Sequence, residues 1–512
     1  MIVSDCGAIA GVEKSHNFSM NEAKAGLRGG CDVDCGVAYS QTVPAALKDG
    51  SIVEQDVERA LNRTLSQLVS LGLANTKPPA PWGSLDQSDV DTAEHRALAK
   101  GAAMQGFVLL KNEGKALPLL QTKRAGGKLK VAVLGPHFNS STHRLANYYG
   151  GNDLVHTQTP LMGLRRRNEL NIVSVAEGVA MCGTFCAHGD IPAAVRAAKK
   201  ADVAVLFVGL HSWQGAQSQA ANVSDDAPGQ NNGPGMEREG YDRTNLTLPE
   251  GQVRLIKAVS AAGVKTVVVL INSGGVACVA WLSDASAVLE AYYPGEMGGD
   301  AMASVLLGDV SPSGRLTTTV YPADFIHKQN ISDMVLRPHG AIPAPTASWS
   351  RSRSEFGFGM SYTSFAFKWA GASDKTAETK NVAADFATYF ASRGAAPPSV
   401  ASPLTYSVSV KNTSAVTSDV VVPCFVASAT NKDGPRRQLA GFERVSRLAP
   451  GAAKMVNIGL APTALTTVTK AGTENVQEGS WSKSCGGAPD GFAHGTLKIS
   501  GIDVETFTLP TA

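Results

Sequence analysis

Between residues 130 and 308, continuous apolar runs alternate with amphipathic segments. The apolar runs are KVAVLG at 130–135, DVAVLFVGL at 202–210, KTVVVLINSGG at 265–275 and AVLEAYYPG at 287–295. Helical patterns lie between or after them, at 190–201, 250–263 and 298–308. Continuous apolar strands separated by amphipathic helices predict a parallel sheet that is covered on both faces. We therefore assign an α/β sandwich domain to residues 119–325.

After residue 403 the pattern changes to alternation of apolar and polar residues. The predicted strands are LTYSVSVKN at 404–412, SDVVVPCFVAS at 418–428, QLAGFERVSRL at 438–448, AKMVNIGLA at 453–461 and GTLKISGIDVETFTL at 495–509. Strands at this spacing, with turns between them, are typical of an antiparallel sandwich of the immunoglobulin-like type. The prediction places this domain at 403–512.

Residues 1–75 contain two short strand–helix units. MIVSD precedes a helical stretch at 21–28, and CDVDCG precedes helical patterns at 41–48 and 54–72. The last of these helices carries a stripe of apolar residues, namely Val57, Leu61, Leu65, Val69 and Leu71. Two parallel strands cannot bury both of their faces alone, so this region is expected to leave apolar surface uncovered.

Two segments separate these regions. Residues 76–118 are a linker, proline-rich at TKPPAPWGS, that leads through a helix at 93–105 into the α/β domain. Residues 326–402 are assigned to a second linker, because they are rich in Ala, Ser, Pro and Thr apart from the segment FGFGMSY.

The composition is that of a globular protein. Of the 512 residues, 43% are hydrophobic and 18% are charged, which excludes a disordered chain. A net charge of +2 does not favour a nucleic acid or a membrane surface as the partner. No run approaches the roughly 18 apolar residues of a membrane span, and no leader peptide is visible.

Cysteines and glycosylation sequons point towards a secretory origin. The eight cysteines include the close pairs Cys31/Cys35 and Cys182/Cys186, for which disulfides, free thiols and a metal site remain open. The spacing of these pairs differs from that of zinc sites, and no pair of histidines completes one. Seven Asn-x-Ser/Thr sequons occur, at Asn17, Asn62, Asn139, Asn222, Asn245, Asn330 and Asn412.

Candidate catalytic residues occur in two segments of the chain. Asp5 follows a short strand, and a long segment without apolar periodicity at 215–235 is followed by Glu237 and Glu239. A long loop inside a compact α/β domain is usually functional, although a run of charges is also typical of a solvated surface. The glycine-rich turns lack the nucleotide-binding fingerprints, and no Ser, Cys or His lies in a recognisable triad. Asp5 and one of the two glutamates, Glu237 or Glu239, remain as the candidate catalytic groups, and the chemistry of two carboxylates needs no metal or organic cofactor.

The order of the segments resembles glycoside hydrolase family 3, in particular its β-xylosidase and α-L-arabinofuranosidase branch. The matching segments are IVSDCGAI, GLRGGCDVDCG, AKGAAMQGFVLLKNEGKALPL, VAVLGPHFNSSTHRLANYYG, EREGYDRTNLTLPEGQVRLI, YYPGEMGGDAMASVLLGDVSPSGRLTTTVYP and EFGFGMSYTSF. The resemblance implies that residues 1–75 are the C-terminal remnant of a (β/α)8 barrel. It also implies that 119–325 are the family's α/β sandwich domain and that 403–512 are a fibronectin type III-like module.

The resemblance also implies roles for the carboxylates. Asp5 corresponds to the catalytic nucleophile and Glu239 to the general acid/base, with Glu237 as the runner-up for the second role. A retaining glycosidase needs two carboxyl groups roughly 5–5.5 Å apart, one to attack the anomeric carbon and one to protonate the leaving oxygen.

Three residues after the acid/base candidate have two alternative roles. Tyr241, Asp242 and Arg243 are candidates for substrate contacts, and the alternative is that Asp242 and Arg243 form an ion pair that shapes the loop. The expected function is exo-acting removal of terminal xylose, or of arabinose or glucose, from plant cell-wall oligosaccharides. The full-length protein is expected to be a secreted glycoprotein.

Only about the last two of the eight barrel units are expected in this chain, which therefore resembles an N-terminally truncated family member. Three explanations are open: a fragment of a longer hydrolase, a barrel segment supplied by another chain, or a catalytically silent carbohydrate-binding or scaffold protein. In the third case we expect sugar binding, or no binding at all, and in either case no turnover.

Overall fold

The computed structural model contains two compact units, Met1–His95 and Arg96–Ala512. The residues that it describes are 1–14, 21–73, 81–122, 127–142, 145, 156–179, 189–212, 237, 243, 245–278, 280–328, 330, 332, 355–371, 375–391, 404–429, 437–468, 473–476, 478–487, 489–501 and 504–508. Each unit is considered by itself. Within these ranges, no helix has both the length and the apolar character that crossing a bilayer requires.

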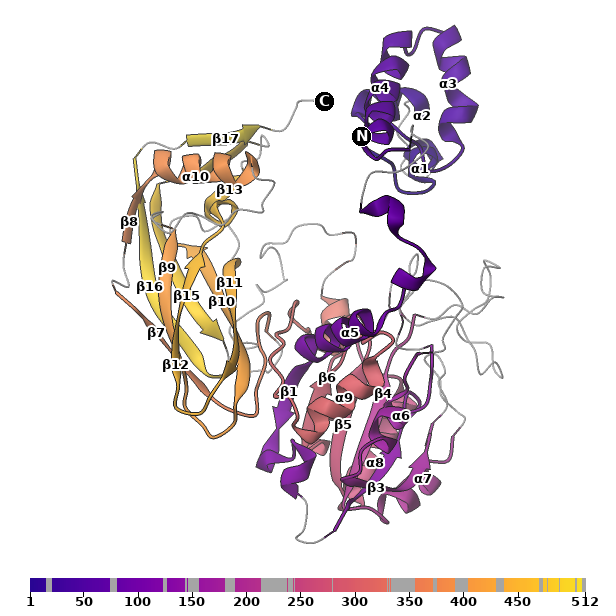
Figure 1. Cartoon of the computed structure of the whole chain (residues 1–512), viewed down its shortest axis with the longest axis vertical. Coiled ribbons are helices and arrows are strands. Elements are labelled where there is room, and N and C mark those ends of the chain that lie inside the picture. Colours follow the sequence, from indigo (N-terminus) through magenta and orange to yellow (C-terminus); the bar gives the residue numbers. More distant parts are fainter. Residues whose placement is uncertain are drawn as a thin grey trace. The chain divides into compact units, whose positions relative to one another are not determined.

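The N-terminal unit is mainly helical (Figure 1). Its helices are α1 (Ala8–Lys14), α2 (Glu22–Gly29), α3 (Ala38–Lys48) and α4 (Glu54–Ser70). The two predicted strands are reduced to a single parallel bridge between Val3 and Val33. Helix α2 is capped at its N-terminus by Asn21, whose side chain accepts hydrogen bonds from the first turn, and at its C-terminus by Gly30 in the left-handed conformation with φ of 94°.

The core of the N-terminal unit is small. Among the described residues, its buried apolar cluster consists of Ala23, Leu27, Ala46, Ile52 and Ala60. The apolar stripe of α4 lies mostly outside this core: Leu61, Leu65 and Val69 are 51%, 55% and 59% exposed. The expectation of uncovered apolar surface is confirmed for the residues that the structure describes in this unit.

The α/β domain is built on a six-stranded sheet with the order β1-β6-β5-β4-β2-β3. Its strands are β1 (Val108–Asn112), β2 (Leu129–Leu134), β3 (Leu170–Ala176), β4 (Val203–Gly209), β5 (Lys265–Ile271) and β6 (Ala287–Glu290). Its helices are α5 (Ala93–Gly106), α6 (Pro160–Arg165), α7 (Ile191–Ala198), α8 (Glu250–Ala261) and α9 (Gly298–Leu307).

Both faces of this sheet are covered, as predicted. In β4, Val205 and Phe207 contribute to one buried core, whereas Leu206 and Val208 contribute to a second core. This alternation follows from the period of two along a strand, because successive side chains point to opposite faces. Helices α6 and α9 supply residues to the first core, and α7 and α8 supply residues to the second.

The sheet differs from the prediction at its two edges. Strand β1 pairs antiparallel with β6, so the sheet begins at Val108, before the predicted start at 119. Strand β3, which pairs parallel with β2, was not predicted. Its residues are mostly half-buried, and they lack the continuous apolar run of the central strands.

The C-terminal β-sandwich contains a five-stranded sheet, β11-β10-β15-β16-β8, and a three-stranded sheet, β12-β9-β7 (Figure 1). A small third sheet has the order β13-β14-β17. The elements are β7 (Phe365–Trp369), β8 (Lys375–Glu378), α10 (Thr379–Ala391), β9 (Thr405–Asn412), β10 (Ser418–Ser428), β11 (Gln438–Leu448), β12 (Ala453–Gly459), β13 (Thr466–Val468), β14 (Thr473–Val476), β15 (Gly479–Gly487), β16 (Gly491–Ser500) and β17 (Val504–Thr508).

Two predictions about the sandwich require correction. Part of the range 326–402, assigned to a linker, belongs to the sandwich, because β7 pairs with β9 and β8 pairs with β16. In β7, Phe365 and Phe367 are buried in the core of the sandwich and Trp369 packs against it, so the strand is too short to show a long alternating pattern. The single strand predicted at 495–509 is two strands, β16 and β17, that belong to different sheets.

Candidate functional site

The carboxyl ends of β4, β5 and β6 meet at one edge of the α/β sheet, because these neighbouring strands are parallel. Polar residues follow each strand: His211 and Ser212 follow β4, Asn272 and Ser273 follow β5, and Tyr292 and Tyr293 follow β6. Glu237 also lies at this edge, since its backbone N–H donates to the carbonyl of His211 at 3.4 Å. Ligand sites of open α/β sheets lie at this edge of the sheet.

The side chain of Glu237 is surrounded by hydrogen-bond donors. The residue is 8% exposed, and its Oε1 accepts hydrogen bonds from the backbone N–H of Ser273 and from the Tyr293 hydroxyl, the latter at 2.6 Å. Its Oε2 accepts from the backbone N–H of Gly274 at 3.2 Å and lies 3.9 Å from Nε of Arg243. Both carboxylate oxygens are therefore engaged by donors from other segments.

Arg243 completes this arrangement. Its Nη2 donates to the carbonyl of Gly275 at 2.9 Å, so the guanidinium contacts both Glu237 and the turn after β5. Glycine at position 274 leaves room for this contact, because an added Cβ would lie 2.8 Å from Nη2 of Arg243. The absence of a side chain at Gly274 thus lets the guanidinium approach the backbone closely.

Burial changes the acidity of two neighbouring groups. Burial, together with the charge of Glu237, raises the pKa of Tyr293 well above its ordinary range, so its hydroxyl remains a hydrogen-bond donor. Burial raises the pKa of Glu290 to about 8, although its carboxyl accepts hydrogen bonds from the Tyr292 N–H at 3.0 Å and from Asn272 Nδ2 at 3.3 Å. Strongly shifted carboxyl groups of this kind gather at functional sites, and also in structural networks.

The structure brings together part of the predicted acid/base segment. Glu237 and Arg243 are joined as an ion pair, whereas Glu239, Tyr241 and Asp242 lie outside the described residues. The contact between Tyr293 and Glu237 leaves no signal in the sequence. The motif AYYPG predicts the end of a strand and resembles a family segment, but nothing in its spacing indicates this contact.

Asp5 lies in the N-terminal unit, on an exposed turn. Its Oδ1 accepts a hydrogen bond from the backbone N–H of Cys6 at 2.7 Å. The turn is held by the disulfide between Cys6 and Cys35, and by the hydrogen bond from the Gly7 N–H to the Cys35 carbonyl at 2.7 Å. The pairing of Asp5 with a carboxyl group of the other unit stays a prediction.

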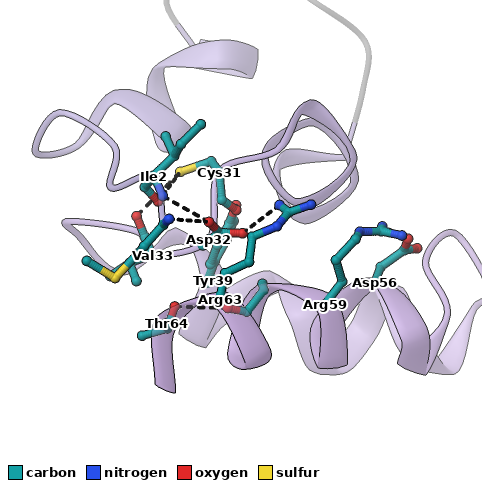
Figure 2. Close-up of polar contacts among 11 residues, drawn as sticks. Ile2, Cys31, Asp32, Val33, Tyr39, Asp56, Arg59, Arg63 and Thr64 are labelled. Atoms are coloured by element: carbon teal, nitrogen blue, oxygen red, sulfur yellow. Dashed lines mark hydrogen bonds and ion pairs between the residues drawn. The ribbon is translucent and has the colours of Figure 1, made fainter. Parts of the chain in front are cut away.

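A second carboxylate of the N-terminal unit, Asp32, was not singled out from the sequence. It is 8% exposed and accepts hydrogen bonds from the backbone N–H of Ile2 at 2.9 Å and from Nη1 of Arg63 at 3.0 Å (Figure 2). Burial opposes its ionisation, but these donors together hold the pKa of Asp32 below its ordinary value. Asp32 therefore ties the segment before Asp5 to helix α4.

The cysteines form two disulfides among the described residues. Cys35 bonds with Cys6 and not with its close neighbour Cys31, which is a free thiol. The second disulfide joins Cys424 and Cys485 across β10 and β15. The pair Cys182/Cys186 lies outside the described residues. In the part of the chain that the structure describes, no group of three or more His, Cys, Asp or Glu residues is placed to hold a metal ion.

These features define a multidomain α/β protein with polar residues gathered at the carboxyl edge of its parallel sheet and with a C-terminal β-sandwich. Residues 107–362 match the glycosyl hydrolase family 3 C-terminal domain, and residues 420–487 match the fibronectin type III-like domain. The chain belongs to glycoside hydrolase family 3.

Relatives within this family are named as xylosidases. A probable exo-1,4-beta-xylosidase bxlB of Aspergillus fumigatus is 34% identical over 473 residues, which are 89% of this chain and 55% of that protein. Exo-1,4-beta-xylosidase xlnD of Aspergillus oryzae is 30% identical over 486 residues, 93% of this chain and 57% of that protein. The chain thus spans a little over half the length of these curated relatives.

Solved structures share the fold. A GH3 exo-beta-xylosidase (XlnD), solved in complex with a xylobiose aziridine activity-based probe, is 26% identical with a TM-score of 0.80, covering 99% of this chain and 62% of that chain. A GH3 beta-glucosidase of Bifidobacterium adolescentis has a TM-score of 0.69 at 23% identity, covering 98% of this chain and 64% of that chain.

Proposed function

We propose that this chain carries the two catalytic carboxylates of a retaining, exo-acting glycoside hydrolase that removes terminal xylose from plant cell-wall oligosaccharides. The observation that carries the proposal is the 34% identity, over 89% of the chain, to a protein named as an exo-1,4-beta-xylosidase. Arabinose and glucose are the competing terminal sugars. No cofactor takes part in the proposed reaction.

In the proposed reaction, Asp5 attacks the anomeric carbon as the general acid donates a proton to the leaving oxygen. The glycosidic C–O bond breaks, and a covalent bond between the sugar and Asp5 forms. A water molecule then attacks the same carbon, gives its proton to the second carboxylate and releases Asp5. The exposure of Asp5 on a turn is consistent with a group that substrate must reach.

Glu239 is our proposed acid/base. The alternative, Glu237, already uses both oxygens as hydrogen-bond acceptors for Ser273, Gly274 and Tyr293. A general acid must take up and release a proton in every cycle. Protonation of Glu237 would cost one of these hydrogen bonds, which supports Glu239 for the role.

A secretory origin is part of the same proposal. The Asn245 and Asn330 sequons are exposed, as is Asn62 on helix α4, and the disulfides are typical of an oxidising compartment. Asn412 is fully buried, and its side-chain N–H groups donate to the carbonyls of Val416 and Leu448. We therefore expect glycans on exposed sequons and none on Asn412.

The decisive test is turnover of aryl β-xyloside, β-glucoside and α-L-arabinofuranoside by the full 512-residue chain. Asp5→Ala is expected to lower the rate by roughly 10⁴-fold or more, as the loss of a catalytic nucleophile does. Asp49→Ala, which replaces an exposed carboxylate of the same unit, is the matched control and should leave the rate unchanged. A folded chain that binds xylo-oligosaccharides without turnover would instead support the carbohydrate-binding or scaffold function.

A further inference from the structure

The strand before Asp5 forms a short parallel ladder that ends irregularly. The Ile2 carbonyl accepts a hydrogen bond from the N–H of Val33 at 3.1 Å (Figure 2), and the Val33 carbonyl accepts one from the N–H of Ser4 at 2.9 Å. In a regular parallel ladder the next bond would join the Cys35 N–H to the Ser4 carbonyl. The Cys35 N–H donates instead to Oγ of Ser4 at 2.9 Å. The side chain of Ser4 therefore takes the place of its own backbone carbonyl.

The following bond is displaced by one residue. A regular ladder would join the Cys35 carbonyl to the N–H of Cys6, but this carbonyl accepts from the N–H of Gly7 at 2.7 Å. The Cys6 N–H donates instead to Oδ1 of Asp5 at 2.7 Å. One extra residue is thus accommodated between Ser4 and Gly7, as in a β-bulge, and bulges beside active sites redirect a side chain.

The extra residue belongs to a tight turn. The N–H of Ala8 donates to the Asp5 carbonyl at 3.1 Å, and Gly7 has a φ of 77°, a left-handed conformation that favours glycine. The Cys6–Cys35 disulfide holds this turn against the neighbouring segment. The end of the ladder and the turn together leave Asp5 exposed.

The neighbouring segment carries the same tripeptide, Asp-Cys-Gly, from Asp34 onwards. There the aspartate has a different task, because Oδ2 of Asp34 accepts from the backbone N–H of Tyr39, in the first turn of α3, at 3.1 Å. Asp34 is half-buried, and the residue before it is Val33, whose side chain cannot accept a hydrogen bond. The tripeptide that presents its aspartate to solvent is the one that follows a serine.

We infer that Ser4 is a positioning residue that acts through Asp5. Its hydroxyl ends the parallel ladder, so that the chain turns and presents the Asp5 carboxylate with one oxygen held by the backbone N–H of Cys6. This inference rests on the proposed function, in which Asp5 is the nucleophile. Ser4 itself takes no part in making or breaking a bond.

Loss of the Ser4 hydroxyl changes which bonds are available to the chain. Without Oγ, the Cys35 N–H either loses its acceptor or binds the backbone carbonyl of residue 4, and the second choice draws Asp5 back into the ladder. A reacting group displaced by about 1 Å can lose about 10²-fold in rate. The attack by Asp5 should therefore slow, while the affinity for the sugar stays the same.

The first part of the test follows backbone amides and needs no activity. In Ser4→Ala, hydrogen exchange of the Cys35 or Gly7 amide is expected to be about tenfold faster, because each donates in one of the two irregular bonds. Ser4→Thr keeps a hydroxyl and should exchange like the wild type. The Val33 amide, which donates to the Ile2 carbonyl before the irregularity, is the internal control.

The second part measures the attack of Asp5 in the full 512-residue chain with a reagent that needs no general acid. In 2-deoxy-2-fluoro-β-xylosyl fluoride the anomeric C–F bond breaks, fluoride leaves, and the carboxylate forms an ester that hydrolyses slowly. Mass spectrometry identifies the labelled aspartate. In Ser4→Ala the labelling rate constant should fall about 10–100-fold, with the inhibition constant of the reagent within about twofold of the wild type. Ser4→Thr should restore most of the rate, and Ser70→Ala, at an exposed position of α4, is the control.

The outcomes separate the inference from the function on which it rests. If the wild type is labelled at Asp5, three results overturn the inference: wild-type labelling in Ser4→Ala, an equally large rise in its inhibition constant, or no recovery in Ser4→Thr. Unchanged exchange at both Cys35 and Gly7 in Ser4→Ala would also overturn it. A wild type labelled at Asp34, or at no aspartate, would instead refute the proposed role of Asp5, and Ser4 would have no nucleophile to position.

Discussion

The N-terminal unit and the α/β domain bury their apolar residues to very different extents. In the α/β domain, Val205 and Leu206 are adjacent in β4 and both fully buried, one in each core. In the N-terminal unit, Leu61 and Leu65 share one stripe of α4 and are more than half exposed. Burial of apolar surface is the dominant favourable contribution to folding, so the α/β domain has a source of stability that the N-terminal unit largely lacks.

The comparison shows how the surroundings of Asp5 and of Glu237 are supported, each within its own unit. Glu237 lies in a buried network that rests on the closely packed sheet. Asp5 lies on an exposed turn that depends on the Cys6–Cys35 disulfide and on the contacts of Asp32. Small cores are commonly supplemented by disulfides, and the N-terminal unit follows this rule.

The largest expected difference is between a buried and an exposed apolar residue. Phe207→Ala removes a fully buried side chain of β4 and should lower the free energy of unfolding of the α/β domain by about 3–5 kcal/mol. Leu65→Ala should change the free energy of unfolding of the N-terminal unit by no more than about 0.5 kcal/mol. Urea unfolding of both variants checks this. An equal loss in Leu65→Ala would mean that the α4 stripe is covered in solution.

The next effect concerns the disulfide beside Asp5. Cys6 and Cys35 are separated by 29 positions, and opening a loop of this size should cost the N-terminal unit about 3–4 kcal/mol through the entropy of its unfolded chain. Thermal unfolding of the Cys6→Ser/Cys35→Ser double variant measures this loss. Cys31→Ser, which alters a free thiol nearby, is the control. A double variant as stable as the control would contradict the supporting role of the disulfide.

A third effect distinguishes the two regions by their response to pH. The pKa of Glu290 is raised from 4.5 to about 8 in the folded protein, so its contribution to stability is complete below pH 4.5 and is lost as the pH rises towards 8. The loss is at most about 1.4 kcal/mol per pH unit. Glu290→Gln cannot titrate, and its melting temperature should therefore fall less between about pH 5 and pH 8. Parallel curves for wild type and variant would exclude this assignment.

The smallest expected effect is on the stability of the N-terminal unit. Here stability is lost as the pH falls, whereas the contribution of Glu290 is lost as the pH rises. The pKa of Asp32 is lowered on folding, so its contribution is present above its unfolded pKa and is lost as the pH falls through its folded pKa. Arg63→Met should shift acid unfolding of this unit to higher pH, with a cost below about 1 kcal/mol at neutral pH because Arg63 is half exposed. Lys48→Met is the control, and an unshifted acid midpoint in Arg63→Met would refute the prediction.

Sequence patterns predicted the central strands of the sheets well and the strands at the sheet edges poorly. Strands β4 and β5 are continuous apolar runs because both of their faces are buried, and this is the strongest pattern that a strand can show. Strands β3 and β7 lack it, since they lie at sheet edges and bury fewer residues. Family membership was also evident from the order of the motifs, and the family 3 match over residues 107–362 confirms it.

By itself, the sequence determined the types of the central elements, the family and the short list of carboxylates. The tertiary structure decided which partners those residues have. Cys35 bonds with Cys6, at a separation of 29, and not with Cys31 in the same motif. The hydrogen-bond donors to the Glu237 side chain come from positions 36, 37 and 56 residues away in the chain, because the ends of parallel strands meet at one edge of the sheet. Such convergence leaves no local pattern, and only the folded chain creates it.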